Sequence, residues 1–370
     1  MEVKIFNLGR EYCEIKISLL ELFDEVCSGG EFILGKNVVA FEAEFARYLG
    51  IEFVAGVGSG TDALRLGGLA LGLKQGDKII TTANTYIATV MALSVHGIIP
   101  VLCDIEPETY NMDPVALEEM LKREKKVKAC IPVHLYGHPC HMEKILEVCG
   151  RYGVKVFEDA CQSHGARYKG RSVGTFGVAS AFSFYPTKNL GAYGDAGAVT
   201  TTDRTVYDEI CKLRNYGQKE KHAHLLEGFN SRLDELQAAI LRFKLTRLDA
   251  DIESRRAIAD IYRLELQQGS PVGIPVEKPW ARHAYHLYVI RTKDRESLRD
   301  HLNRHGIGTL VHYPTPIHLQ AAYQKLGYKE GAFRETESAV REILSLPIYP
   351  GLKRDEVMYI CKTIKDFYAR

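Results

Sequence analysis

The stretch ASAFSFYPTKNLGAYGDAGAVTTT (residues 179–202) joins two apolar runs through a glycine-rich loop that contains one lysine, Lys188. The runs at 179–184 and 197–202 lack the polar alternation of a surface strand, so they indicate strands buried on both faces. A buried lysine is costly unless its charge is paired or lost, whereas an exposed lysine needs no such setting. The loop is therefore either an ordinary surface turn or a place where Lys188 performs chemistry.

Other short apolar runs precede this stretch, and amphipathic segments separate them. This alternation predicts a mostly parallel sheet covered by helices, which is the doubly wound α/β class. A continuous helical pattern at 231–268 follows, and then strand and helix patterns alternate to the C-terminus. We expect a large α/β domain at 1–248 and a smaller α+β domain at 249–370. The preceding runs are 53–57, 78–82, 100–105, 129–135 and 154–160.

Composition and charge exclude several classes of protein. The 370 residues are 46% hydrophobic and 26% charged, and the net charge of +1 gives no general attraction for nucleic acid or anionic membranes. The nine cysteines include no C-x-x-C pair, and the charged N-terminus lacks the apolar core of a signal peptide. The most apolar stretch, 87–103, is interrupted by histidine, glycine and proline. We therefore expect a cytoplasmic protein without nucleic-acid or membrane partners.

The segment GSGTDA (58–63) follows an apolar run and opens a helical pattern, and it matches G-x-G-x-x-A. A dinucleotide site of this type also needs an acidic residue at the end of the next strand, where this chain has TAN (82–84). What remains is a helix N-terminus whose N–H groups and hydroxyl suit a single phosphate.

The segment PVHLYGHPCHM (132–142) gathers side chains that could bind a metal, namely His134, His138, Cys140 and His141. A glycine and a proline within it indicate a turn, and neither H-E-x-x-H nor a paired C-x-x-C supports a metal site. A loop leaving a strand is the better interpretation, and a metal-dependent hydrolase is the alternative.

Asp159, Ser183 and Lys188 fall at or just past the ends of predicted strands, as does Tyr86 in ANTYIAT. Singly, each has a structural explanation: Asp159 as a helix cap, Ser183 as a core hydroxyl, Tyr86 as packing. In open α/β sheets, however, ligands bind beyond the carboxyl ends of the strands. With the phosphate site, these residues indicate pyridoxal phosphate: the lysine forms a Schiff base, the carboxylate keeps the pyridine nitrogen protonated, and the aromatic ring stacks.

Ordered blocks along nearly the whole chain resemble the DegT/DnrJ/EryC1 group of sugar aminotransferases. This resemblance implies the aspartate-aminotransferase-like (fold type I) architecture of transferases that depend on pyridoxal 5'-phosphate. One departure is Ala196-Gly197, where the family usually has two glycines. The blocks are FILGKNVVAFEAEFARYLG, GVGSGTDAL, ANTYIATVMA, VFEDACQSHGARYKG, SFYPTKNLGAYGDAGAV, GFNSRLDELQAAIL, HYPTPIHLQ and LPIYPGL.

The resemblance implies roles for individual residues. Lys188 would form the Schiff base and shuttle the proton, as in the transaminases rather than the dehydratases, which have histidine there. Asn230, in GFNSRLDELQAA, would reach the phosphate of the neighbouring subunit, which implies a homodimer with shared active sites. The other implied contacts with the cofactor are Asp159 to the pyridinium, Gln162 to the ring hydroxyl, Tyr86 stacked on the ring, and Gly60, Thr61 and Ser183 to the phosphate.

The implied substrate depends on EDACQSHGA, where Gln162 and His164 resemble the branch acting on nucleotide-linked 3-keto-6-deoxyhexoses. The branch acting at C4 more often has histidine in place of Gln162. The resemblance would place His164, Tyr185, His312 and Tyr313 near the sugar nucleotide, although each could equally be interdomain packing.

The expected function is transfer of an amino group from glutamate to the 3-keto group of a dTDP-linked 3-keto-6-deoxyhexose. One alternative is a C4-aminotransferase acting on a UDP-, GDP- or dTDP-linked 4-keto sugar. Another is a regulatory protein that binds pyridoxal phosphate without catalysis.

Overall fold

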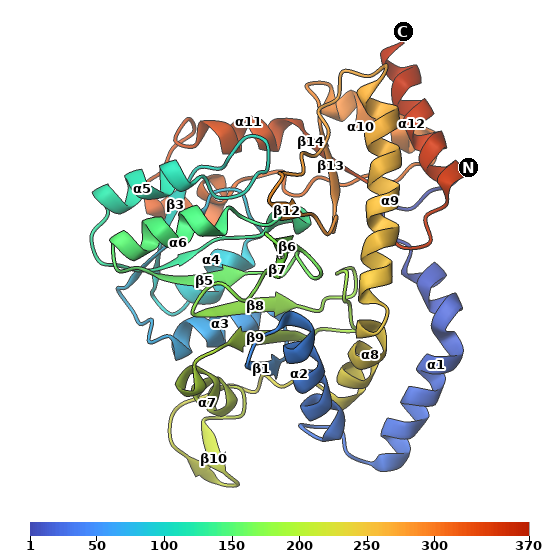
Figure 1. The fold of residues 1–370 in the computed structure, drawn as a ribbon. Helices are drawn as coiled ribbons and strands as arrows, with labels where there is room; N and C mark the ends of the chain where they lie inside the picture. The colour runs from blue at the N-terminus through green and yellow to red at the C-terminus, as the bar shows by residue number, and fades with distance from the viewer. Residues whose placement is uncertain (370) are drawn as a thin grey trace.

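A seven-stranded sheet forms the centre of the computed structural model, which describes residues 1–369 (Figure 1). In sheet order its strands are β1 (Phe53–Val57), β9 (Gly197–Thr201), β8 (Ala179–Ser183), β5 (Lys155–Asp159), β4 (Val127–Ile131), β2 (Lys78–Thr82) and β3 (Ile99–Cys103). The pairs from β8 to β3 are parallel, whereas β9 is antiparallel to both β8 and β1. The prediction of an α/β fold with a mostly parallel sheet is confirmed.

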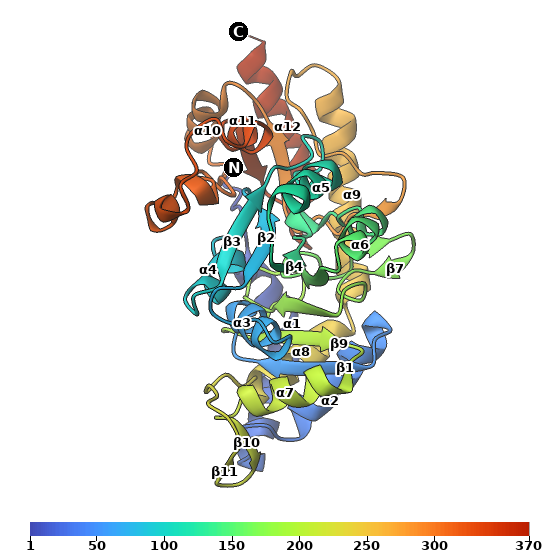
Figure 2. The same cartoon turned by 90° about the vertical axis from the view of Figure 1, so that its left-hand side faces the viewer.

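Helices cover both faces of this sheet because its strands are apolar on both sides (Figures 1 and 2). Successive strand residues point to opposite faces, so Ile79 of β2 packs with α3, α4 and α7, and its neighbour Ile80 packs with α5 and α6. The helices are α2 (Lys36–Leu49), α3 (Gly60–Ala70), α4 (Ala88–Ser94), α5 (Pro114–Arg123), α6 (Met142–Arg151), α7 (Arg204–Leu213) and α8 (Glu235–Leu245).

The helical pattern at 231–268 forms two helices rather than one, since α8 ends at Leu245 and α9 (Leu248–Gln267) begins three residues later. The break lets α8 stay against α2 while α9 continues into the C-terminal part (Figure 1). Ile252 of α9 packs in the same apolar cluster as α2 and α8, and Tyr262 packs in the C-terminal cluster. One helix thus joins two cores, and the division into 1–248 and 249–370 stays a prediction.

The C-terminal cluster also receives the start of the chain, since Val3 is buried there and pairs with Ile307. Its main elements are β13 (Tyr288–Arg291), β14 (Ile343–Leu346), α10 (Arg295–Arg304) and α12 (Arg354–Tyr368), with α11 (Arg334–Glu342) alongside. The remaining elements are β6 (Arg167–Tyr168), β7 (Arg171–Ser172), β12 (Ala281–Arg282) and the 3-10 helices at Leu135–Gly137, Ile317–Leu319 and Ala321–Leu326.

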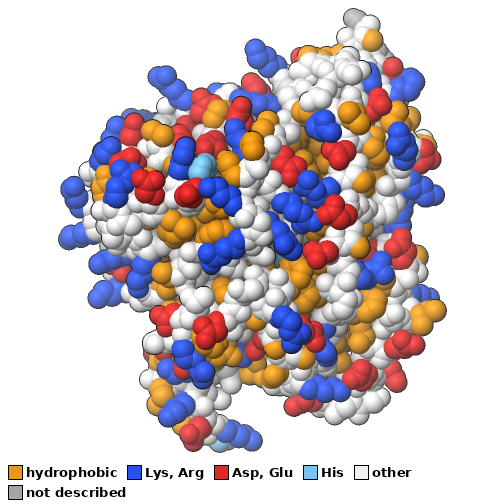
Figure 3. Space-filling model, in the orientation of Figure 1, with side chains coloured by type: hydrophobic (Ala, Val, Ile, Leu, Met, Phe, Trp, Pro, Cys, Tyr) orange, Lys and Arg blue, Asp and Glu red, His pale blue; other side chains and the backbone are white. Residues whose placement is uncertain are grey.

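Two elements extend away from the sheet. The hairpin of β10 (Gln218–Glu220) and β11 (Ala223–His224) projects from one end of the molecule, and α1 (Leu8–Gly29) runs along one side (Figures 1 and 2). Acidic and basic side chains are interspersed on the face drawn in Figure 3. Within residues 1–369, no helix is long and apolar enough to span a membrane.

Candidate active site

A cavity of about 480 Å³ lies at the carboxyl ends of the parallel strands. Because these ends meet at one edge of the sheet, residues from distant segments converge there. Phe6, near the N-terminus, and the segment before β13 complete the wall. The predicted site residues that line the cavity are Gly60, Thr61, Tyr86, Asp159, Gln162, Ser183, Tyr185, Lys188, His312 and Tyr313.

Lys188 lies in the loop that follows β8, and its backbone N–H donates to Tyr185 O at 2.8 Å. The loop folds back so tightly that a Cβ at Gly191 would lie 2.4 Å from Pro186 O, which explains the glycine there. Burial lowers the pKa of the Lys188 ammonium from its ordinary value, although Cys161 and Asp159 act in the opposite direction. The site therefore favours the neutral, nucleophilic form of the amine more than water does.

Asp159 ends β5, and its carboxyl group is held by two donors. Thr89 Oγ1 donates to Oδ2 at 2.8 Å, and Cys161 N donates to Oδ1 at 3.1 Å. Thr89 lies in the first turn of α4, four residues after Thr85, and their hydroxyl oxygens are 2.8 Å apart. These contacts fix the orientation of a carboxyl group that is only 4% exposed.

Gln162 and two tyrosines form the next part of the wall. Gln162 Oε1 accepts from Tyr136 N at 2.8 Å, and Nε2 donates to Tyr313 Oη at 3.0 Å. The Tyr313 ring lies 5.4 Å from the ring of Tyr86. Tyr86 is half exposed, so its face is free to cover a planar ligand.

The start of α3 forms a cradle that has no room for side chains. A Cβ at Gly60 would lie 2.5 Å from Ser183 Cβ, and a Cβ at Gly197 would lie 2.3 Å from Ser59 O. Ser59 caps the helix by accepting from Asp62 N at 3.1 Å. Gly60 and Thr61 are the first residues of the helix and line the cavity, and the free N–H groups of a helix start can bind a phosphate.

Two predicted site residues do not line the cavity. Asn230 is exposed, and the hydroxyl of its neighbour Ser231 accepts from Gly58 N at 3.1 Å and donates to Asp62 Oδ2 at 2.9 Å. His164 is 1% exposed, and its ring packs 5.4 Å from Phe182 and 5.5 Å from Phe184. The structure places His164 behind the wall, because the aromatic packing holds its ring there.

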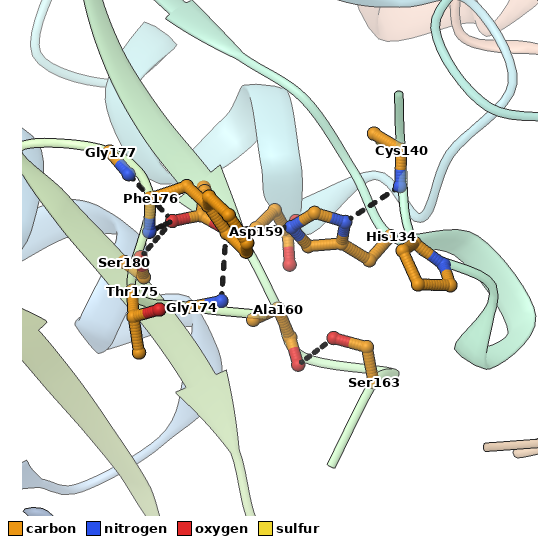
Figure 4. A network of polar contacts seen from close by, with 12 residues as sticks. His134, Cys140, Asp159, Ala160, Ser163, Gly174, Thr175, Phe176, Gly177 and Ser180 are labelled. Atoms are coloured by element: carbon orange, nitrogen blue, oxygen red, sulfur yellow. Dashed lines mark hydrogen bonds and ion pairs between the residues drawn. The ribbon is translucent and has the colours of Figure 1, made fainter. Parts of the chain in front are cut away.

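The histidines of the segment 132–142 contact different partners, and Figure 4 shows His134 beside the backbone of Cys140. His134 Nε2 lies 2.9 Å from Glu158 Oε2, while His134 Nδ1 accepts from Cys140 N at 3.0 Å. His138 Nδ1 lies 2.7 Å from Pro139 O, and His141 Nδ1 lies 3.1 Å from the Tyr168 hydroxyl. In the described chain, no three His, Cys, Asp or Glu side chains are grouped to hold a metal ion.

Glu158 is the buried centre of this network. Besides His134, its carboxylate accepts from Gly174 N at 2.9 Å, Phe176 N at 2.7 Å, Gly177 N at 2.8 Å and Ser180 Oγ at 3.0 Å. Burial alone raises the pKa of this carboxyl group, but the hydrogen bonds from His134 and the two glycines lower it overall. Glu158 thereby ties β5 to the loop before β8, next to Asp159.

Residues 14–365 match the DegT/DnrJ/EryC1/StrS aminotransferase family. The chain belongs to this family. It is 43% identical over 365 residues to the erythromycin biosynthesis sensory transduction protein EryC1 of Saccharopolyspora erythraea, with 99% of each chain covered. It is 40% identical over 368 residues to the dTDP-3-amino-3,4,6-trideoxy-alpha-D-glucose transaminase of Streptomyces venezuelae, covering 100% of this chain and 97% of the relative.

Among solved structures, DesV of S. venezuelae in complex with a ketimine intermediate is 40% identical and superposes with a TM-score of 0.97. The alignment covers 100% of this chain and 99% of DesV. The prediction of a fold type I transferase is therefore confirmed, and the chain is an aminotransferase that uses pyridoxal 5'-phosphate. The cradle at Gly60, the amine of Lys188 and the carboxyl group of Asp159 fit this cofactor.

The cavity of this aminotransferase also contains residues that the sequence did not predict. Thr89 could have been found, because TYIAT places two hydroxyls four residues apart at a helix start. Phe6 and His286 carried no such signal, since each reaches the wall only through the packing of the C-terminal part against the sheet.

Proposed function

We propose that this aminotransferase moves an amino group from glutamate to the 3-keto group of a dTDP-linked 3-keto-6-deoxyhexose. The observation that carries the proposal is the convergence of Lys188, Asp159 and the start of α3 in one cavity. Amination at C3 is supported by Gln162 and by the relative whose name specifies a dTDP-3-amino sugar. The products are a 3-amino sugar nucleotide and 2-oxoglutarate.

Pyridoxal 5'-phosphate, when bound, supplies an aldehyde for the Lys188 amine and a pyridinium ring that withdraws electrons from the reacting carbon. Asp159 keeps the ring nitrogen protonated, held in place by Thr89 and Cys161 N. Gln162 would bond the ring hydroxyl, and Tyr86 would stack on the ring. The phosphate is held by the N–H groups of Gly60 and Thr61 and the hydroxyl of Ser183.

Lys188 Nζ takes the proton from Cα of glutamate, and it returns a proton to C3 of the sugar in the second half-reaction. Burial supports this role, because a lowered pKa keeps more of the amine in its basic form at neutral pH. Tyr185, His312 and Tyr313 hold the sugar nucleotide in the cavity that contains Lys188. His312 Nδ1 lies 2.8 Å from Ser345 Oγ, which orients its ring.

We further propose a homodimer in which Asn230 completes the phosphate site of the partner subunit. Asn230 is exposed and outside its own cavity, so it is available to a second copy. α1 also exposes a large apolar surface, with Ile17 74% exposed, Leu20 54% and Phe23 52%. All nine cysteines are free, which fits the reducing cytoplasm that we propose as the location.

The test uses the purified enzyme loaded with cofactor and a panel of keto sugar nucleotides. Glutamate should bleach the visible absorbance, and the product with the dTDP-linked 3-keto sugar should carry its amino group at C3 by NMR. An amino group at C4 would select the alternative regiochemistry. Bound cofactor without any half-reaction with glutamate would instead support a regulatory protein.

A further inference from the structure

Tyr136 lies next to the cavity and bonds to three residues that line it. It follows β4 in the 3-10 helix Leu135–Gly137 and is 3% exposed. Its backbone N–H donates to Gln162 Oε1 at 2.8 Å, and its carbonyl oxygen accepts from Leu287 N at 3.2 Å. Its hydroxyl donates to the carbonyl oxygen of His312. These three partners come from distant segments of the chain and line the cavity, whereas Tyr136 itself does not.

The backbone of Tyr136 is in the left-handed region, with φ 59° and ψ 2°. This region is unfavourable for a residue with a large side chain, and such residues persist where the surrounding structure holds them, often at functional sites. The next residue, Gly137, packs so closely against the segment before β13 that a Cβ would lie 2.9 Å from His286 N. This close packing and the three hydrogen bonds hold the tyrosine in its conformation.

Two of these bonds close a loop of contacts that passes through the residues expected to bind the sugar nucleotide. Gln162 Nε2 donates to Tyr313 Oη at 3.0 Å, and Tyr313 follows His312 in the chain. The loop begins at the Tyr136 N–H, and it returns to Tyr136 through the hydroxyl bond to the His312 carbonyl. One residue thus contacts both the side chain expected at the ring hydroxyl of the cofactor and the peptide expected at the sugar.

The direction of the first bond fixes the orientation of the Gln162 amide. A backbone N–H can only donate, so the atom facing Tyr136 is the amide oxygen and the other end is the NH2 group. One N–H of this group goes to Tyr313 Oη, and the second makes no hydrogen bond within residues 1–369. Gln162 lines the cavity, where an amide N–H suits a ring oxygen that carries negative charge.

We propose that Tyr136 is a positioning residue that joins the cofactor end of the active site to its sugar end. This inference rests on the proposed function. The N–H of Tyr136 keeps the NH2 group of Gln162 toward the cofactor, and its hydroxyl holds the peptide of His312 and Tyr313 beside that group. Burial raises the pKa of the hydroxyl well above its ordinary value, so it remains a donor in alkaline as well as neutral buffers. The segment PVHLYGHPCHM (132–142) thereby serves the active site through one tyrosine.

The experiment uses Tyr136→Phe, which removes one oxygen and keeps the backbone N–H. The Gln162 amide should stay in place, so the rate at which glutamate bleaches the visible absorbance should change less than about threefold. The His312 carbonyl loses its donor, so the KM for the sugar nucleotide should rise about five- to thirtyfold. Tyr262→Phe is the matched control, because the Tyr262 hydroxyl also donates to a buried carbonyl, that of Pro347 at 2.9 Å, in the C-terminal cluster. The control should leave both half-reactions unchanged.

Binding of the amino sugar gives a readout that does not depend on turnover. Enzyme loaded with the pyridoxamine form of the cofactor cannot react with an amino sugar, so the Kd of a dTDP-linked 3-amino-6-deoxyhexose can be measured by calorimetry. Tyr136→Phe should raise this Kd as much as it raises KM. Tyr313→Phe opens the same loop of contacts at another point, so the double variant should raise Kd by less than the product of the two single effects.

Failure of the inference and failure of the proposed function can be distinguished. A wild-type enzyme that does not aminate the sugar nucleotide would contradict the proposed function itself. With an active wild type, the role of Tyr136 would be overturned by an unchanged KM and Kd in Tyr136→Phe, by equal losses in both half-reactions, or by effects of Tyr136→Phe and Tyr313→Phe that multiply. A Tyr136→Phe enzyme that does not load the cofactor would also overturn it, because the hydroxyl would then be needed for the fold rather than for the sugar.

Discussion

Replacing Gly60 with alanine tests whether the start of α3 holds the cofactor phosphate. The new Cβ would lie 2.5 Å from Ser183 Cβ and 2.9 Å from Ser183 Oγ. Carbon atoms in contact are ~3.5–4.0 Å apart, so the start of α3 and the end of β8 must separate by roughly 1 Å. A hydrogen bond of about 2.9 Å that lengthens by this amount is lost.

The loss of one hydrogen bond to a charged phosphate costs about 1.5–3 kcal/mol. This cost raises the Kd for pyridoxal phosphate roughly ten- to 150-fold. The assay is a titration of the apoenzyme followed by visible absorbance. Gly150→Ala is the matched control, because a Cβ there meets no atom within 4 Å. If Gly60→Ala bound the cofactor within about threefold of the control, the phosphate would not lie in this cradle.

The remaining predictions concern charges and the subunit interface. Asp159→Asn should fold and load cofactor but lose on the order of a hundredfold in kcat, and an unchanged kcat would assign the ring nitrogen to another residue. Glu158→Gln should lower the free energy of unfolding by about 3 kcal/mol or more in denaturant titrations, because one amide replaces a buried carboxylate with five donors. The pKa of Glu158 is lowered in the folded protein, so its contribution to stability is complete above its ordinary pKa of 4.5 and is lost as pH falls through the folded pKa. The free energy of unfolding of the glutamine variant should therefore depend less on pH below 4.5 than that of the wild type. Mixed dimers of Lys188→Ala and Asn230→Ala subunits should recover activity above either parent if Asn230 acts in trans, and proven exchange without recovery would contradict this.

The sequence predicted those parts of the site that follow from local pattern. Lys188 and Asp159 each stand at the end of a buried run, and a parallel sheet brings such ends to one edge. The cradle at Gly60 was predictable for a similar reason, since a glycine at a strand-to-helix junction indicates close approach.

Contacts made by tertiary packing left no local signal. His164 stands in the same motif as Gln162, but the rings of Phe182 and Phe184 hold it behind the wall. His286 reaches the cavity because the C-terminal part packs against the sheet, and nothing in HAYHLYVI indicates that neighbour. The interruption between α8 and α9 was also missed, because the apolar stripe continues across it.

The pairing of Val3 with Ile307 has a consequence for how the chain is made. Val3 N donates to Gly306 O at 2.8 Å, and Gly308 N donates back to Val3 O at 2.8 Å. A ribosome adds about 5–20 residues per second, so Val3 leaves it roughly 15 to 60 s before its partners exist. During that time Val3 must remain in water or on a chaperone. The C-terminal cluster that receives Val3 can therefore close only when synthesis is nearly complete.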